Sequence, residues 1–140
     1  MMRNAHEGWG LANDGKNLIF SDGGPSFYYA DPGTFEIRKS VRIRTNLSAE
    51  ISGLNELEFV DGKLFGNIFL TREIVRIDPA TGCIDGLADL SVLWQAMTPE
   101  ERAEIDMPET VLNGIAFDSN TKLFYLTGKL WRTIFSGRFS

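Results

Sequence analysis

Residues 14–34 read DGKNLIFSDGGPSFYYADPGT, and residues 61–81 read DGKLFGNIFLTREIVRIDPAT. Both stretches begin with Asp-Gly-Lys and end with Asp-Pro-x-Thr, so they share a single offset, 61 − 14 = 78 − 31 = 47 residues. A repeat of about 40 to 50 residues that is rich in short apolar runs and turn residues is typical of β-propeller blades. The two stretches therefore predict an all-β fold built from repeated antiparallel units.

At this period the 140 residues hold three units, whereas closed propellers have roughly four to eight blades. We predict one partial β-propeller domain over residues 1–140, in which about three blades form an open sector. The blades are expected at about 8–46, 54–90 and 112–140. The chain is then expected to be a fragment of a longer propeller, or to receive the remaining blades from a second chain.

One short inserted helix is predicted at about 98–106. Thr98 suits the N-cap, Pro99 suits the first helical position, and Glu101 completes a capping box. The insertion accounts for the longer spacing before the third unit, where Asp118 lies 118 − 61 = 57 residues after Asp61.

The composition excludes several kinds of partner. The formal net charge is −5 and no basic run is present, which disfavours nucleic acid. No apolar run reaches the roughly 20 residues that span a bilayer, and residues 1–6 lack the apolar core of a signal peptide. We therefore expect no nucleic-acid partner, no membrane partner and no export signal in the chain as written.

Most familiar catalytic motifs are missing. The sequence contains no GxSxG, no P-loop, no HExxH and no CxxC. A Ser-His-Asp relay and a multi-histidine zinc site are implausible because His6 is the only histidine.

Polar residues recur instead at equivalent strand entrances: Glu7, Asn55 with Glu56, and Asn113. The alternative for the two asparagines is turn capping, and the alternatives for Glu56 and the nearby Glu58 are a solvent-facing position or calcium binding.

Lys129 and Trp9 have unusual neighbours. Lys129 follows a glycine and precedes Leu-Trp, and a cation among apolar groups costs free energy unless a carboxylate or a polarised carbonyl matches it. The alternative is an ordinary surface lysine. Trp9 lies between two glycines, so it is either an exposed stacking wall for a ligand or a core residue.

Five ordered motifs resemble the plant- and bacterial-type glutaminyl cyclases, which are glutaminyl-peptide cyclotransferases. The motifs are EGWGL at 7–11, LNELE at 54–58, RIDPATG at 76–82, VLNGIA at 111–116 and TGKLW at 127–131. The resemblance covers nearly the whole chain and implies a five-bladed propeller. It also implies an acyl-transfer reaction that converts the N-terminal glutamine of a peptide or protein to pyroglutamate and releases ammonia.

The resemblance also implies roles for individual residues. Lys129 is placed beside the reacting atoms as the catalytic candidate, and Trp9, Asn55 and Phe69 are placed in the substrate pocket. Phe69 stands where the family usually has a tryptophan, so an aromatic wall is kept but an indole donor is lost. No metal ligand and no cofactor is implied, and the family is periplasmic or secreted.

One expected element of the family's chemistry is missing. The family's catalytic glutamate belongs to blades that would precede residue 1, and a shuttle carboxylate is needed to move a proton from the attacking amine to the departing ammonia. We therefore expect the chain to be a poor catalyst alone, with Glu7 and Glu56 as candidate substitutes. Open blade edges further predict self-association.

Two other functions remain open. A calcium-dependent lactonase-like propeller also carries an asparagine-glycine strand like residues 112–115, but the lysine at position 129 would repel calcium. The other alternative is a noncatalytic propeller that acts as a binding module.

Overall fold

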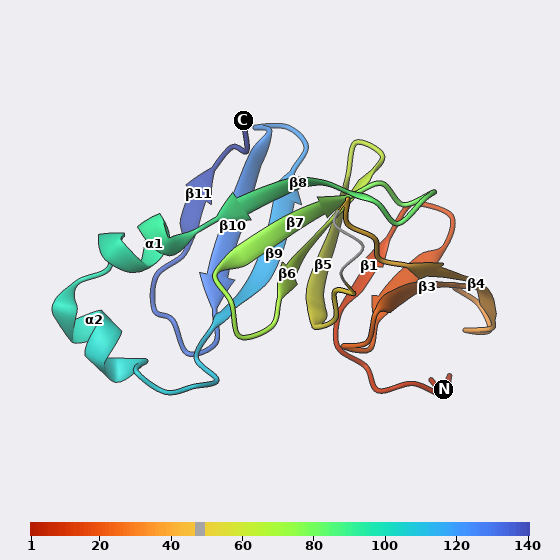
Figure 1. Cartoon of the computed structure of the whole chain (residues 1–140), viewed down its shortest axis with the longest axis horizontal. Coiled ribbons are helices and arrows are strands. Elements are labelled where there is room, and N and C mark those ends of the chain that lie inside the picture. Colours follow the sequence, from red (N-terminus) through yellow and green to blue (C-terminus); the bar gives the residue numbers. More distant parts are fainter. Residues whose placement is uncertain (47–49) are drawn as a thin grey trace.

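The computed structural model describes residues 1–46 and 50–140 (Figure 1). The described residues form three antiparallel sheets and two short helices. Sheet 1 contains β1 (Leu11–Asn13), β2 (Leu18–Ser21), β3 (Ser26–Ala30) and β4 (Ile37–Arg42). Sheet 2 contains β5 (Leu54–Val60), β6 (Lys63–Ile68), β7 (Glu73–Ile77) and β8 (Ile84–Asp89). Sheet 3 contains β9 (Leu112–Asp118), β10 (Leu123–Gly128) and β11 (Phe135–Gly137).

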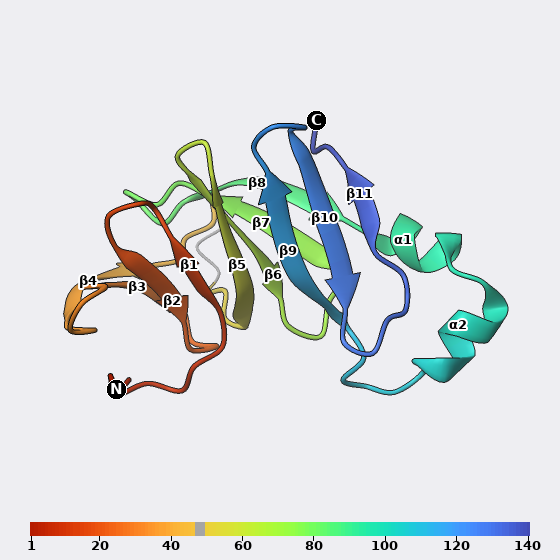
Figure 2. The ribbon, with the colours of Figure 1, turned by 180° about the vertical axis from the view of Figure 1, so that it is seen from behind.

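Each sheet is a meander in which strands that follow one another in the chain are hydrogen-bonded neighbours. The first strands of the sheets, β1, β5 and β9, lie next to one another, with β5 in contact with both of the others (Figure 2). The sheets thus succeed one another around a common line of inner strands. This is the all-β, open-sector arrangement that the 47-residue repeat predicts.

The same backbone conformation recurs at equivalent turns. In the turn between the second and third strand of each sheet, one residue has a left-handed φ: Gly23 at 78°, Leu70 at 65° and Leu130 at 64°. The first two are 70 − 23 = 47 residues apart, which is the offset of the sequence repeat. Glycine adopts this conformation without strain, whereas leucine does so at a cost of roughly 1–2 kcal/mol.

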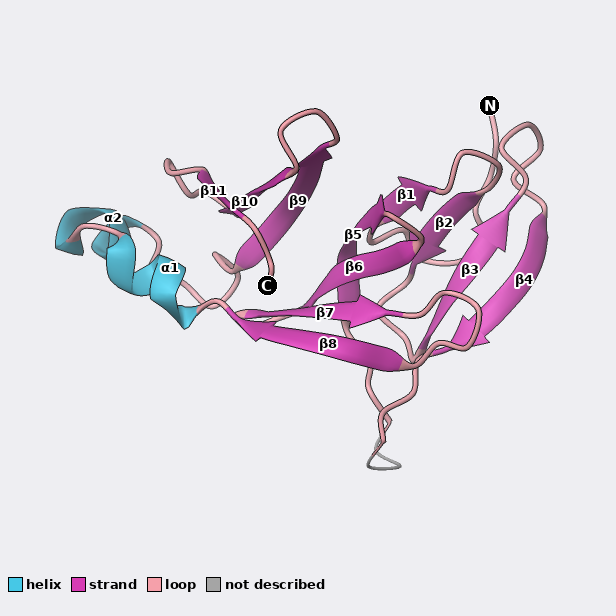
Figure 3. Ribbon diagram, turned by 90° about the horizontal axis from the view of Figure 1, so that it is seen from above, coloured by secondary structure: helices cyan, strands magenta, loops and turns pink. Residues whose placement is uncertain are grey.

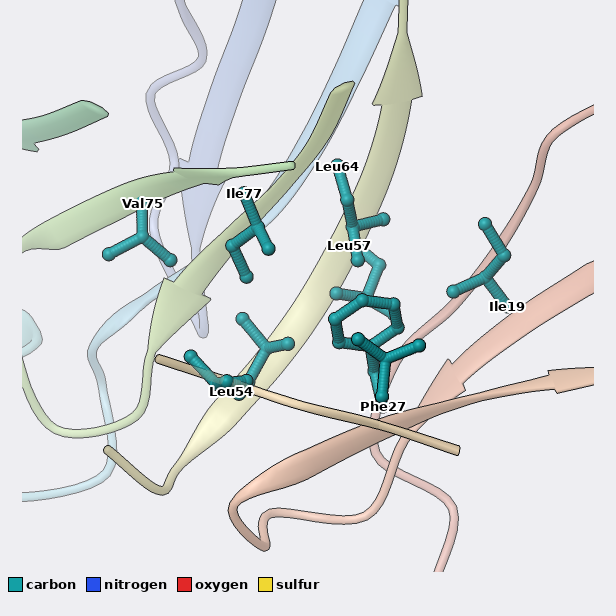
Figure 4. Packing of buried hydrophobic residues seen from close by; sticks show 9 residues of the cluster. Ile19, Phe27, Leu54, Leu57, Leu64, Val75 and Ile77 are labelled. Carbon is teal, nitrogen blue, oxygen red and sulfur yellow. The ribbon is translucent and has the colours of Figure 1, made fainter. Parts of the chain in front are cut away.

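Two apolar layers fill the spaces between the sheets. Between sheets 1 and 2, Ile19 and Phe27 face Leu54, Leu57 and Leu64, and all five are almost completely buried (Figure 4). The layer between sheets 2 and 3 is built in the same way from buried residues that include Val60, Phe65, Leu112, Ile115 and Phe124. Each fully buried side chain of this kind stabilises the fold by about 1.5–3 kcal/mol relative to an exposed one.

Ser21 joins the inner strands of sheets 1 and 2. Its hydroxyl accepts a hydrogen bond from the backbone N–H of Gly10 at 2.9 Å and donates one to the backbone carbonyl of Asn55 at 2.7 Å. The side chain is completely buried, so both bonds are shielded from water. The backbones at Gly10 and Asn55 lie so close together that a Cβ at Gly10 would be 1.9 Å from the Asn55 carbonyl oxygen.

Asn67 makes the corresponding link between sheets 2 and 3. Its amide oxygen accepts from the backbone N–H of Glu56 at 2.9 Å, and its amide nitrogen donates to the carbonyl of Leu112 at 2.7 Å. It too is completely buried. We call Ser21 and Asn67 the inter-sheet relay, since each lies at or near the end of a second strand and connects the inner strand of its own sheet to the next inner strand.

The segment between sheets 2 and 3 holds two helices, α1 (Ser91–Ala96) and α2 (Pro99–Glu104), where the sequence predicts one (Figure 3). The capping box of α2 forms as expected between Thr98 and Glu101. α1 was not predicted because its N-cap, Leu90, has no capping side chain. Neither helix in the described part of the chain is long and apolar enough to cross a membrane.

The inter-sheet relay gives a stability prediction. Ser21→Ala should lower the free energy of unfolding by about 1–3 kcal/mol, because the N–H of Gly10 and the carbonyl of Asn55 lose a buried partner. Urea unfolding followed by tryptophan fluorescence measures this change. Ser136→Ala, at an exposed position of β11, is the matched control and should change the stability by less than about 0.5 kcal/mol. Equal effects of the two substitutions would contradict the importance of the relay.

The outer face of sheet 3 gives a prediction about the solution state. Ile115 and Phe124 face sheet 2, whereas the paired residues Ala116 and Tyr125 point away from it and are exposed. Leu11 on β1 is 58 % exposed at the other end of the arc. Exposed apolar faces and strand edges pair with other chains, so purified residues 1–140 should self-associate. Light scattering that shows only monomer at tens of micromolar would contradict this.

Candidate active site

One cavity of about 320 Å³ brings together the four site residues that the sequence names. Trp9, Asn55, Phe69 and Lys129 all line it. The other lining residues are Glu7, Gly8 and Asn113. The two end members of this group, Glu7 and Lys129, are 129 − 7 = 122 positions apart in the chain, so only the packing of the three sheets brings them together.

The strand topology explains this convergence. Asn55 and Asn113 lie in the first two positions of the inner strands β5 and β9, and Trp9 lies just before β1. Phe69 and Lys129 directly follow the second strands β6 and β10. In an antiparallel pair, the start of one strand lies beside the end of its partner, so all five residues lie at the same end of the inner strands.

Two aromatic side chains form one wall of the cavity. The rings of Trp9 and Phe69 meet edge to face, with centroids 5.2 Å apart and an interplanar angle of 77°. Trp9 also lies against the turn of sheet 1, where a Cβ on Gly23 would approach its ring to 2.6 Å. The aromatic wall is therefore fixed by contacts from both sheet 1 and sheet 2, and its geometry suits a flat polar group such as an amide.

Lys129 supplies a cation at the cavity. Its Nζ lies 5.1 Å from the centroid of the Phe69 ring, which is within the range of a cation–π interaction. The lysine is exposed rather than enclosed by the apolar residues beside it in the sequence. The charge therefore remains solvated without a ligand and is available at the rim of the cavity.

Asn55 supplies a buried amide. Only 6 % of the residue is exposed, yet its side chain makes no hydrogen bond with another described residue. Its backbone carbonyl is held by the Ser21 hydroxyl, so the position of the side chain is set by the inter-sheet relay. Among the described residues no side-chain N or O atom is both fully buried and unpaired, so the Asn55 amide reaches the open space of the cavity, where a ligand can bond to it.

The carboxylates near the site differ in their surroundings. Glu7 is exposed and lines the cavity, whereas Glu56, one residue after Asn55, does not line it. Burial raises the pKa of the Glu56 carboxyl above its ordinary value. Burial, and then the charge of Glu56, likewise raise the pKa of Glu58. Of the two substitutes for a shuttle carboxylate that the sequence offers, only Glu7 is at the cavity.

The cavity thus offers aromatic stacking, a buried amide, a cation and an exposed carboxylate. Asn113, which sequence analysis identifies as a turn cap or a site residue, is among the lining residues. Within the ranges 1–46 and 50–140, no three His, Cys, Asp or Glu side chains are grouped so that they could hold a metal ion.

Comparison with known proteins gives consistent matches. The family model for glutamine cyclotransferase matches residues 1–139. A glutaminyl-peptide cyclotransferase from Arabidopsis thaliana is 38 % identical over 129 residues, which are 92 % of this chain and 39 % of that protein. The crystal structure of Myxococcus xanthus glutaminyl cyclase has a TM-score of 0.88 and 34 % identity, over 96 % of this chain and 56 % of that one.

A more distant structure shares only the fold. Kuenenia stuttgartiensis hydrazine synthase matches 97 % of this chain and 34 % of its own, with a TM-score of 0.57 and 14 % identity. Of the two glutaminyl cyclases, the chain spans only part: 39 % of the Arabidopsis protein and 56 % of the Myxococcus chain.

The close approach of β1 and β5 gives a prediction for the cavity. Gly10→Ala should destabilise the fold by about 1–3 kcal/mol, because its Cβ would meet the backbone carbonyl of Asn55 and force the strands apart. Gly8→Ala, two residues earlier, is the control, since a Cβ there meets no atom within 4 Å. Urea unfolding of both variants checks this. If Gly8→Ala destabilises the chain as much as Gly10→Ala, the close approach is not the cause.

Proposed function

The chain belongs to the glutamine cyclotransferase family, and we propose that its cavity binds the N-terminal glutaminyl residue of peptides for cyclisation to pyroglutamate. The observation that carries the proposal is the meeting of Trp9, Asn55, Phe69 and Lys129 at one cavity. These side chains come from all three sheets. They combine the flat walls and the polar groups that a primary carboxamide requires.

Each lining group suits a part of the substrate. The γ-carboxamide is planar, and the edge-to-face rings of Trp9 and Phe69 give it an apolar surface to lie against. Its oxygen can accept hydrogen bonds from the Asn55 amide and the Lys129 ammonium. The exposed carboxylate of Glu7 is the group at the cavity that attracts the positively charged α-amine.

The reaction forms one bond and breaks another. The deprotonated α-amine attacks the γ-carboxamide carbon, and negative charge develops on the amide oxygen. Expulsion of ammonia then restores the carbonyl and leaves the five-membered lactam. Lys129 and Asn55 stabilise the oxyanion in this scheme, because donors aimed at developing charge lower the barrier more than they tighten substrate binding.

Proton transfer is the step that these residues serve least well. A proton must leave the α-amine and another must reach the departing ammonia, and a single carboxylate can carry both. Glu7 is exposed, and no described residue holds its carboxylate in a fixed position. We therefore propose that residues 1–140 by themselves bind glutaminyl peptides but cyclise them slowly.

The chain spans only part of the relatives that it matches, so cyclisation by the whole protein belongs to the proposal. The 140 residues account for 39 % of the Arabidopsis protein and 56 % of the Myxococcus chain. A fusion that adds the N-terminal part of a family member to residues 1–140 therefore tests whether the cavity works within a complete propeller.

The fusion gives a kinetic prediction. Lys129→Ala should lower kcat for ammonia release from a glutaminyl dipeptide by roughly 10²–10³-fold with little change in KM, because its charge acts mainly in the transition state. Asn55→Ala should change both constants, since the amide also contacts the bound substrate. Lys16→Ala, at an exposed turn, is the control and should leave both constants unchanged.

Two further arms test the alternatives. Rapid turnover by residues 1–140 without the fusion would mean that Glu7 serves as the shuttle, and Glu7→Gln should then abolish it. Loss of turnover in the presence of a strong chelator would favour a metal-dependent mechanism instead. Binding of glutaminyl peptides with no turnover even in the fusion would favour a noncatalytic binding module.

A further inference from the structure

A second and larger cavity lies between sheets 2 and 3. Its volume is about 740 Å³, which is in the range of sites that bind small molecules and peptide side chains. Three parts of the chain form its walls: the turn 70–73 that leads into β7, the segment 105–112 that leads into β9, and Trp94 of α1. Trp131 forms part of the lining on the side of sheet 3. We call this cavity the inter-sheet groove.

The groove adjoins the candidate active site along the chain. Leu70 in the groove directly follows Phe69, and Leu112 directly precedes Asn113. Trp131 lies two residues after Lys129. These three chain neighbours place the groove next to the candidate active site, so a peptide that extends by up to about 3.6 Å per residue can continue from one into the other.

Several contacts hold the groove open. The indole N–H of Trp131 donates to the carbonyl of Thr110 at 2.9 Å, and the Thr110 hydroxyl donates to the carbonyl of Met107 at 2.7 Å. On the opposite wall, the Arg72 guanidinium lies over the Trp94 ring, with Cζ 4.6 Å from the centroid. The groove is therefore a built feature of the fold rather than a loose gap between a loop and a sheet.

The charges in the groove favour a cationic ligand. It is lined by three carboxylates, Glu73, Asp89 and Asp106, and by one cation, Arg72. Arg72 is stacked on Trp94, and its charge helps to lower the pKa of Asp89, after the hydrogen bonds from Ser91. With three carboxylates and one guanidinium, the formal charge of the lining is 1 − 3 = −2.

The apolar part of the groove complements these charges. Leu70, Met107 and the two tryptophans present aliphatic and aromatic surface beside the carboxylates. Lysine and arginine side chains match this combination, because an apolar stem ends in a charged head that also interacts favourably with aromatic rings.

Leu70 is held at the groove in a strained conformation. Its φ is 65°, and 58 % of the residue is exposed. The equivalent turn of sheet 1 has glycine, Gly23, which adopts this φ without strain. Leu130 has the same φ and is also exposed, so what distinguishes Leu70 is its position: its apolar side chain lines the groove and is accessible to a ligand.

We propose that the inter-sheet groove binds the residues that follow the N-terminal glutamine of the substrate, and that it selects peptides with lysine or arginine at the second or third position. This inference rests on the proposed function, because it assumes that the glutaminyl residue occupies the candidate active site.

Calorimetric titration of residues 1–140 with matched peptides tests the proposal. The probes are the amides of Gln-Lys-Arg-Gly, Gln-Glu-Glu-Gly and Gln-Gly, each confirmed intact by mass spectrometry after the titration. The basic peptide should bind the most tightly and the acidic one the most weakly. Neutralising Glu73 and Asp106 with Glu73→Gln and Asp106→Asn should each reduce the preference for the basic peptide by about two- to fivefold. Glu100→Gln, on exposed α2, is the charge-matched control.

A pair of leucine variants tests the apolar wall without a risk to folding. Leu70→Gly should leave the fold intact or stabilise it, since glycine accepts the left-handed φ, and it should weaken binding of the basic peptide. Leu130→Gly is the matched control, because Leu130 has a φ of 64° and is 69 % exposed but does not line the groove. It should leave binding unchanged.

The outcomes separate the inference from the proposed function. If Gln-Gly binds and Asn55→Ala weakens it, but the carboxylate and Leu70 variants leave the preference between peptides unchanged, the groove proposal is wrong and the proposed function stands. If Ala-Lys-Arg-Gly amide binds as tightly as its glutaminyl counterpart, the groove binds basic peptides but the proposed function fails.

Discussion

The structure depends on two buried hydrogen-bonding side chains that hold neighbouring inner strands together. Ser21 bridges Gly10 and Asn55, and Asn67 bridges Glu56 and Leu112. Apolar packing alone would leave the sheets free to slide, because it is not directional. The hydrogen bonds are directional, and the cost of leaving their buried partners unpaired fixes the register in which one sheet meets the next. The relay therefore sets the positions of the strand entrances, where the candidate active site lies.

The candidate active site contains both a fixed and an exposed polar side chain, because its residues come from different parts of this framework. Asn55 is buried and belongs to the strand that the relay fixes, so its amide is positioned before a ligand arrives. Lys129 is exposed and its Nζ lies near the Phe69 ring, so its ammonium stays solvated at the rim of the cavity. The larger inter-sheet groove begins beside these residues. Two cavities of different size, about 320 Å³ and about 740 Å³, are thus lined by residues that are neighbours in the chain.

The repeat in the sequence predicted the fold because turn residues and strand periodicity are local properties. The matched stretches 14–34 and 61–81 share the turn sequences Asp-Gly-Lys and Asp-Pro-x-Thr, and their offset returns in the left-handed turns of the structure. The capping box at Thr98 was predicted for the same reason. The first helix, residues 91–96, was not, because no side chain caps its start. The short inner strand 11–13 and the outer strand 84–89 are each defined by pairing with a neighbour rather than by a pattern of their own.

The sequence by itself determined the class of fold and the family resemblance, because both rest on residue types at fixed spacings, and that resemblance implied the four side chains of the candidate active site. Only the tertiary structure decided which carboxylate reaches the cavity: Glu7 lines it, and Glu56, beside Asn55 in the chain, does not. Only the tertiary structure revealed the inter-sheet groove, whose walls come from segments that share no motif. The physical reason is that burial, cavity shape and the pairing of charges depend on contacts between distant segments, which no local pattern encodes.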